Sequence, residues 1–255
     1  MKTYFIIILL SIGTTAGIKA QDYKVNKTSG KIVINLPSVT VEGYSGSQVI
    51  FSSERKESEM DPRAKGLQAI NGAGFIDNTG LGISVTENGK SLDVNAVASD
   101  LAIKILVPKG LMVSFEFHKV ILAGKVYLKN LENEIVVSTD YNPVELENIT
   151  GPVTARSIYG SIDATFGAVV KGPVSITSVY KAVDVAIPVS TKANLKLISS
   201  HGSILASAEL KIELEKKGNE EMISYGSAVN GKLNGGGTDF KLSSDYGKIY
   251  LRKSK

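Results

Sequence analysis

The sequence predicts an all-β fold, a single-stranded parallel β-helix or β-solenoid of roughly 21-residue coils with an irregular β-rich N-terminal part. Two observations carry this prediction. A motif of a ring, a turn-forming residue and a branched aliphatic recurs about every 21 residues. The segments around it, such as Ile162-Asp163-Ala164, alternate apolar and polar side chains, which is typical of half-buried strands. Two strands and two turns in 21 residues suit one solenoid coil better than a helical repeat or a propeller blade.

We expect residues 1–20 to be a secretory signal peptide. Lys2 provides a positive start, residues 4–12 are apolar, and Ala20 ends a suitable cleavage sequence. The apolar run is too short to span a bilayer and no later run is long enough, so no transmembrane segment is expected in the mature chain. The chain has no cysteine, so neither a lipidated cysteine nor disulfides are expected. The sequence therefore predicts export to the periplasm, the cell surface or the medium.

The charge pattern argues against nucleic acid as a partner. The formal net charge is +4, and loss of Lys2 and Lys19 with the signal peptide leaves +2, because 4 − 2 = 2. The remaining basic residues are interspersed with acidic ones. A nucleic-acid surface needs clustered cations, so no nucleic-acid binding is expected.

Beyond the signal peptide we expect a single domain, residues 21–255, with two parts. Residues 22–97 contain strand-like segments without the repeat. Within them a charged run at 52–70 predicts an exposed loop. Residues 98–255 contain the regular coils. No segment shows the 3.6-residue periodicity of an ordinary helix.

The ring positions of the motif predict a ladder along one edge of the coils. Successive rings are 18, 21, 21, 24 and 21 residues apart. They are Tyr141, Tyr159, Tyr180, His201, Tyr225 and Tyr246. Stacked rings fix the register between coils, and we expect packing to be their main role. An exposed ladder would offer a strip to a glycan or an extended peptide, with the five tyrosines as ligand-binding residues.

Two further expectations concern the ladder. Glycine follows most of the rings, which predicts turns with positive φ. An internal duplication places His118 one rung before Tyr141, so His118 and His201 would lie four rungs, or roughly 19 Å, apart. This separation is too large for a shared metal ion.

Glu145, Asp163 and Asp184 hold the polar middle position of three repeats. This placement predicts a column of carboxylates on the outer surface. Such a column could bind Ca²⁺ or supply paired acids for glycan chemistry. Two exposed charges about 5 Å apart repel by only ~1 kcal/mol in water, so we favour an empty, solvated column. Neither a metal site nor a cofactor is therefore expected.

Several segments carry a family resemblance. They are RAKGL at 63–67, DNTGLG at 77–82, VPK at 107–109, ENITGPV at 147–153, VY at 179–180, NGKLNGGG at 230–237 and YGKIYLRK at 246–253. Together they resemble a family of exported Bacteroidetes proteins with a β-strand-repeat domain of unknown function, often labelled "putative adhesin". The resemblance implies an adhesin-like protein and supplies no catalytic or ligand-binding residues. Lys181-Ala182 departs from the Gly-Asp more common in the family, which predicts an altered corner there.

The sequence predicts a non-catalytic, exported, adhesin-like or scaffolding protein that presents a repetitive β surface to a glycan, a peptide or an envelope protein. We find no catalytic constellation, so an enzyme is not expected. Two alternatives stay open at this point. One is a β-helix carbohydrate-active enzyme that uses the acidic column, and the other is an accessory of envelope-stress signalling.

Overall fold

The computed structural model describes residues 22–53, 63, 66–99, 102–215 and 227–254. The predicted signal peptide and most of the predicted 52–70 loop lie outside these residues. In the described part a short 3-10 helix, η3 (Ala208–Leu210), accompanies the strands. No helix within these ranges is long and apolar enough to cross a membrane.

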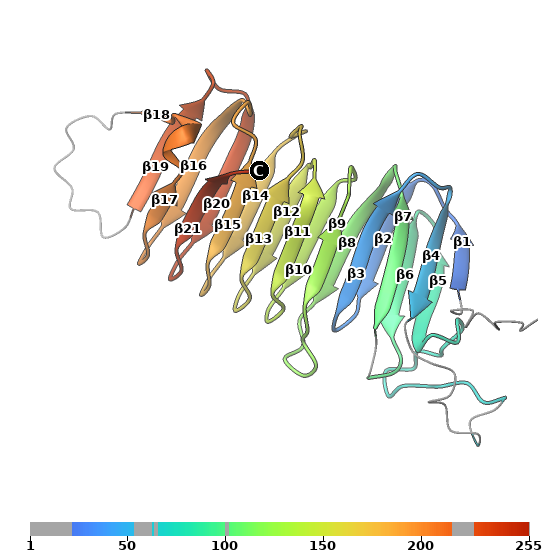
Figure 1. Ribbon diagram of the computed structural model, residues 1–255. Coiled ribbons are helices and arrows are strands. Elements are labelled where there is room, and N and C mark those ends of the chain that lie inside the picture. Colours follow the sequence, from blue (N-terminus) through green and yellow to red (C-terminus); the bar gives the residue numbers. More distant parts are fainter. Residues whose placement is uncertain (1–21, 54–62, 64–65, 100–101, 216–226, 255) are drawn as a thin grey trace, which may run out of the picture.

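The strands form two large sheets, which we call sheet A and sheet B (Figure 1). Sheet A has ten strands, in the spatial order β1 (Asp22–Asn26), β4 (Gln48–Ser53), β7 (Ile103–Pro108), β3 (Val39–Tyr44), β9 (Val126–Lys129), β11 (Val144–Ile149), β13 (Ile162–Phe166), β15 (Val183–Ile187), β21 (Ile249–Lys253) and β17 (Ile204–Ala206). Sheet B has eleven, in the order β18 (Glu213–Leu214), β19 (Ser227–Leu233), β16 (Ala193–Ser199), β20 (Thr238–Ser244), β14 (Val174–Ser178), β12 (Val153–Ser157), β10 (Ile135–Thr139), β8 (Leu111–Phe117), β2 (Gly30–Asn35), β6 (Ser91–Ala96) and β5 (Ile83–Asn88).

The middle of the molecule follows the sequence repeat. Each repeat gives one strand to sheet B and the next strand to sheet A, and we call such a pair a rung. Strand β12 pairs in parallel with β10 and β14, and β13 pairs in parallel with β11 and β15. The 21-residue spacing is the distance in sequence between register partners, such as Ile162 and Val183.

The core lies between the two sheets, because alternate residues of every central strand point inward. Phe166 of sheet A and Phe240 of sheet B meet there with ring centroids 5.8 Å apart. Ile162, Val183 and Ile249 form one fully buried column. Ile204, the next member of that column, is half-buried because β17 is an edge strand. The predicted inward alternation is confirmed in these strands.

Near both ends, the spatial order of the rungs departs from the order of the sequence. The rung β20–β21 lies between β14–β15 and β16–β17, although it follows both in the chain (Figure 1). Similarly, β2–β3 lies between β8–β9 and the strands β6 and β7. Two segments distant in sequence are therefore inserted into the stack.

Antiparallel pairs complete both ends of the sheets. Strands β1, β4 and β7 pair antiparallel in sheet A, as do β5 and β6 in sheet B. At the other end, β19 pairs antiparallel with β16 and β18. The all-β prediction is confirmed, but the sheets are mixed and the rungs do not follow one another in simple order. The order of the rungs follows from the pairing of β20 with β14 and β16, and of β2 with β6 and β8, and not from the repeat in the sequence.

Candidate functional site

Five side chains form a row at the corner where strands of sheet B lead into strands of sheet A; we call it the aromatic row. Its members, in spatial order, are Tyr141, Tyr159, Tyr180, Tyr246 and His201. Neighbouring ring centroids lie 5.0, 4.9, 5.0 and 4.7 Å apart. The interplanar angles are 15°, 3°, 6° and 7°, so the rings stack nearly parallel. The predicted ladder is thus present at these five positions.

The order of the row differs from the expected order. Tyr246 stacks between Tyr180 and His201, because the strand just before it, β20, lies between β14 and β16. Tyr225, the remaining predicted member, lies outside the described residues. His118 is not in the ring position, because Phe117 pairs with Thr139 and His118 therefore aligns with Asp140 rather than with Tyr141. The expectation that His118 precedes Tyr141 in the ladder is wrong by one residue.

His118 instead contacts the residue with which it aligns. Its Nδ1 lies 2.9 Å from a carboxylate oxygen of Asp140. Its Nε2 lies 3.4 Å from the hydroxyl of Ser138. These contacts place the imidazole beside the start of the aromatic row and not within the stack.

Backbone hydrogen bonds hold the row in register. From Tyr159 onward, the amide of each ring residue donates to the carbonyl of the residue just before the preceding ring of the row. The four bonds, of 2.6 to 2.9 Å, join Tyr159 to Asp140, Tyr180 to Ile158, Tyr246 to Val179 and His201 to Asp245. Ring spacing therefore follows strand spacing, which is about 4.8 Å in a sheet.

A buried hydroxyl lies two residues before each ring, a signal that the sequence analysis missed. Ser178 and Ser244 are fully buried, and each donates to a carbonyl of the neighbouring rung, at 2.9 Å to Gly160 and 2.8 Å to Lys181. The Ser244 hydroxyl also accepts a hydrogen bond from the amide of Gly247 at 2.9 Å. Because buried hydroxyls need partners, these bonds explain the recurring Ser or Thr of the motif.

The glycines that follow the rings are needed for space and not for positive φ. Gly160, Gly202 and Gly247 do not adopt positive φ. A Cβ at Gly160 would overlap the carbonyl oxygen of Asn142 on the neighbouring rung. Lys181 stands where these three corners have glycine. Its amide still donates a hydrogen bond to the Ser178 hydroxyl, at 3.2 Å, so this bond does not depend on glycine. The expectation of positive φ is therefore wrong, and the Lys181 corner keeps the serine hydrogen bond that Gly160 makes.

The tyrosines of the row are open to solvent. Tyr141, Tyr159, Tyr180 and Tyr246 are 38%, 45%, 45% and 54% exposed. Their faces are largely used in stacking, so the row presents ring edges and hydroxyls at a repeat of about one strand spacing. Such a strip offers regularly spaced donors, acceptors and apolar edges to an extended ligand.

The three predicted carboxylates lie side by side on the outer face of sheet A. Glu145 pairs in register with Asp163, and Asp163 pairs with Asp184. The column ends in cations: Lys125 forms an ion pair with Glu145, and Arg252 Nε lies 2.7 and 2.9 Å from the two oxygens of Asp184. The outer carboxylates are therefore already paired.

Asp163 is the central member of this column, and no described residue forms an ion pair with it. Partial desolvation raises its pKa above the usual value, and the charges of Asp184 and Glu145 raise it further. Among the described residues, no group of three or more His, Cys, Asp or Glu side chains is arranged to hold a metal ion. The column can carry a proton at Asp163, flanked by two ion pairs.

Comparisons with known proteins yield likeness in fold only. No family model and no curated protein matches the chain. One similar solved structure is described as "a putative cell adhesion protein" from Clostridium sporogenes; at 12% identity it covers 92% of this chain and 100% of its own, with a TM-score of 0.47. Another is described as "a putative adhesin" from Bacteroides fragilis; at 12% identity it covers 91% and 97%, with a TM-score of 0.37. The second description uses the label that the sequence resemblance gave, and the first speaks of cell adhesion.

Proposed function

We propose that this chain is a non-catalytic, exported, adhesin-like protein that binds an extended glycan or peptide along its aromatic row. In this proposal the two sheets are the faces of one β-solenoid with rungs inserted near both ends. The observation that carries it is the exposure of the stacked rings. A row that served packing alone would be covered, whereas these tyrosines are 38–54% exposed.

The regular spacing of the row supports an extended ligand. Each rung repeats one ring edge at about 5 Å over five consecutive positions, and the four tyrosines also repeat a hydroxyl. A ligand that lies along the row can repeat one contact at every rung. Since the stack is held by backbone bonds, the row is ordered before binding and little conformational entropy is lost.

The test uses variants of the row with a matched control elsewhere. The chain is screened on a glycan array and against extended peptides. Tyr159→Leu and Tyr180→Leu remove the ring and the hydroxyl, while Tyr159→Phe keeps the ring. Tyr127→Leu is the control, because Tyr127 is an outward-facing tyrosine of β9 that belongs to the column of Glu145 and not to the row.

We expect the Leu variants to lose about ten-fold or more in affinity while the control retains it. Thermal unfolding measured in parallel separates binding from packing. If Tyr159→Leu lowers the melting temperature and leaves the affinity of the folded fraction unchanged, the row serves packing and the proposal fails.

The carbohydrate-active alternative has one specific observation in its favour, the raised pKa of Asp163 between two carboxylates. Its neighbours Glu145 and Asp184 are held by Lys125 and Arg252, which opposes their use as nucleophile or base. Incubation of acidic and neutral polysaccharides with the chain, with and without Ca²⁺, tests it. Product formation that is lost in Asp163→Asn would favour the enzyme over the adhesin.

A further inference from the structure

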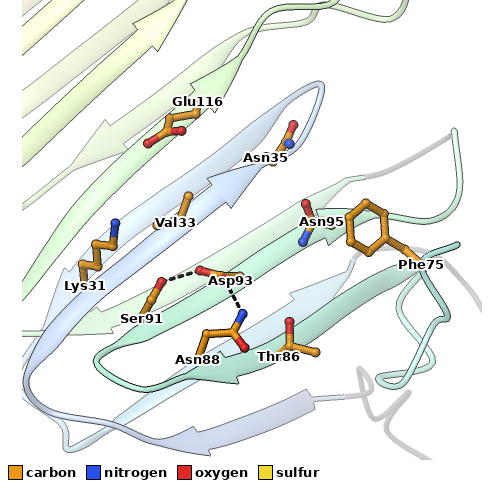
Figure 2. Close-up of a pocket in the computed structure, with 10 residues that line it drawn as sticks. All are labelled: Lys31, Val33, Asn35, Phe75, Thr86, Asn88, Ser91, Asp93, Asn95 and Glu116. Carbon is orange, nitrogen blue, oxygen red and sulfur yellow. Dashed lines mark hydrogen bonds between the residues drawn. The ribbon is translucent and has the colours of Figure 1, made fainter. Parts of the chain in front are cut away.

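A groove lies on the outer face of sheet B near its β5 end, separate from the aromatic row and the acidic column (Figure 2). Its volume is about 500 Å³, within the range of small-ligand sites. Strands β8, β2, β6 and β5 form its floor, and the segment that precedes β5 supplies one aromatic wall. The groove therefore combines a rigid sheet with a single ring.

Two amides form the floor beneath that wall. Asn35 of β2 and Asn95 of β6 are register partners, so their side chains lie about one strand spacing apart on the same face. Within the described part of the chain, neither side-chain amide makes a hydrogen bond to another residue, and Figure 2 shows both near Phe75. Each amide offers two donors and an acceptor to a ligand.

The ring of Phe75 is held in place by its own turn. The side-chain oxygen of Asn71 accepts hydrogen bonds from the amides of Ala73 and Phe75, each at 3.0 Å. The side-chain nitrogen of Asn71 donates to the carbonyl of Ala96, at the end of β6, at 2.7 Å. This anchor fixes the turn to the strand that carries Asn95, so the backbone of Phe75 is positioned before any ligand arrives. Phe75 remains 37% exposed.

Charge is placed away from the ring. The carboxylate of Asp93 already accepts hydrogen bonds from Asn88, at 2.5 Å, and from the hydroxyl of Ser91. Lys31 and Glu116 lie on the side of the groove opposite Phe75 (Figure 2). The part next to the ring is consequently neutral, with free amide donors and acceptors.

We propose that this groove binds a neutral saccharide unit, which stacks one face on Phe75 and hydrogen-bonds its hydroxyls to Asn35 and Asn95. A sugar hydroxyl both donates and accepts, which matches an amide, and the C–H face of a sugar ring is apolar, which matches phenylalanine. Neither amide is charged, so the pair offers an anion or a cation no ion pair. The site is independent of the aromatic row, because no residue is shared between them.

The experiment measures binding of neutral oligosaccharides that end in glucose, galactose, mannose or N-acetylglucosamine, by saturation-transfer NMR and titration calorimetry on the full mature chain. We expect at least one of these probes to bind. Phe75→Ala and Asn95→Ala should each weaken it about ten-fold or more, while Phe75→Tyr retains it. Because Phe75 is partly exposed and makes its bonds through the backbone, the melting temperature of Phe75→Ala should stay close to that of the unmodified chain.

Tyr159→Leu separates this site from the row. Saccharide binding that survives Tyr159→Leu and is lost in Phe75→Ala supports the groove, whatever becomes of the proposed function. Binding lost only in Tyr159→Leu overturns the groove and favours the row. Failure of all four probes, or binding only to charged saccharides or to peptides, also overturns the proposal.

Discussion

Tyr246 stacks against Tyr180 on one face and His201 on the other, with centroids 5.0 and 4.7 Å away, although it follows His201 by 45 residues in the sequence. This arrangement exists because β20–β21 is inserted between two rungs formed by earlier residues. Residues 238–253 are therefore an internal part of both sheets. Their removal affects the chain differently from removal of an outer strand.

We expect a chain truncated after Leu233 to lose its single cooperative unfolding transition. The truncation removes β20 and β21, which are the parallel partners of β14, β15, β16 and β17. Circular dichroism melting and hydrogen exchange of β16 provide the measurement. As a control, deletion of residues 22–26 removes β1, an edge strand of sheet A, and should lower the melting temperature without loss of cooperativity. A truncated chain that still melts in one native-like transition would contradict the internal role of this rung.

Val183→Ala should lower the free energy of unfolding by about 1–4 kcal/mol, through lost burial and a residual cavity. Val183 is fully buried between Ile162 and Ile249. Urea denaturation measures the change. Thr165→Ala, an exposed position on the neighbouring strand β13, is the control and should stay within about 0.5 kcal/mol of the unmodified chain. Equal losses for both variants would show that the inward column is not a core.

Ser244→Ala should cost about 1–3 kcal/mol, because it leaves the Lys181 carbonyl and the Gly247 amide without their buried partner. Ser243→Ala is the matched control, since Ser243 is half-buried and its hydroxyl makes no hydrogen bond to a described residue. Denaturation in urea again gives the change. If Ser244→Ala loses no more free energy of unfolding than Ser243→Ala, the buried hydroxyl of Ser244 does not stabilise the corner.

Asp163→Asn should raise the melting temperature near neutral pH. The fold raises the pKa of Asp163, so its ionised form is less favourable in the folded chain than in the unfolded chain. The resulting destabilisation is present above the raised pKa and disappears as the pH falls below the unfolded value. The gain of the variant should therefore shrink between about pH 7 and about pH 3.

Asp184→Asn provides the contrast for Asp163→Asn. It removes the partner of Arg252 and should not raise the melting temperature at neutral pH. A lower melting temperature for Asp163→Asn, or a gain unchanged by pH, would contradict the assigned cause of the pKa shift. Calcium should alter the melting temperature little, because the outer carboxylates are occupied by cationic side chains.

The sequence predicts the local structure better than the arrangement of distant segments. Alternation and the ring motif locate the central strands and the stacking residues, because both are set by contacts between neighbouring rungs. The position of Tyr246 could not be predicted in this way. The rung that contains it has the same motif as its neighbours, so the motif does not tell which strands β20 pairs with. The predicted position of His118 is wrong by one residue. The sequence motif fits two alignments, and only the pairing of Phe117 with Thr139 in the structure distinguishes them.

The groove beside Phe75 shows a different limit of the sequence. Asn35, Phe75 and Asn95 come from three separate segments of the region that lacks the repeat, and no spacing brings them together. The buried serines were, by contrast, detectable. Ser or Thr stands two residues before Tyr141, Tyr159, Tyr180, His201 and Tyr246 in the sequence itself.

The inserted rung β20–β21 also constrains the order in which the molecule can assemble while the chain is being synthesised. A chain that emerges from its N-terminus presents β14 and β16 before the strand that must join them exists. Until β20 is made, the edges of β14 and β16 that it pairs with lack their native partner, so growth in the order of the sequence cannot complete the sheet. The pairing of both sheets is complete only after residues 238–253 have been made, because β20 and β21 are the partners of strands that precede them in the chain.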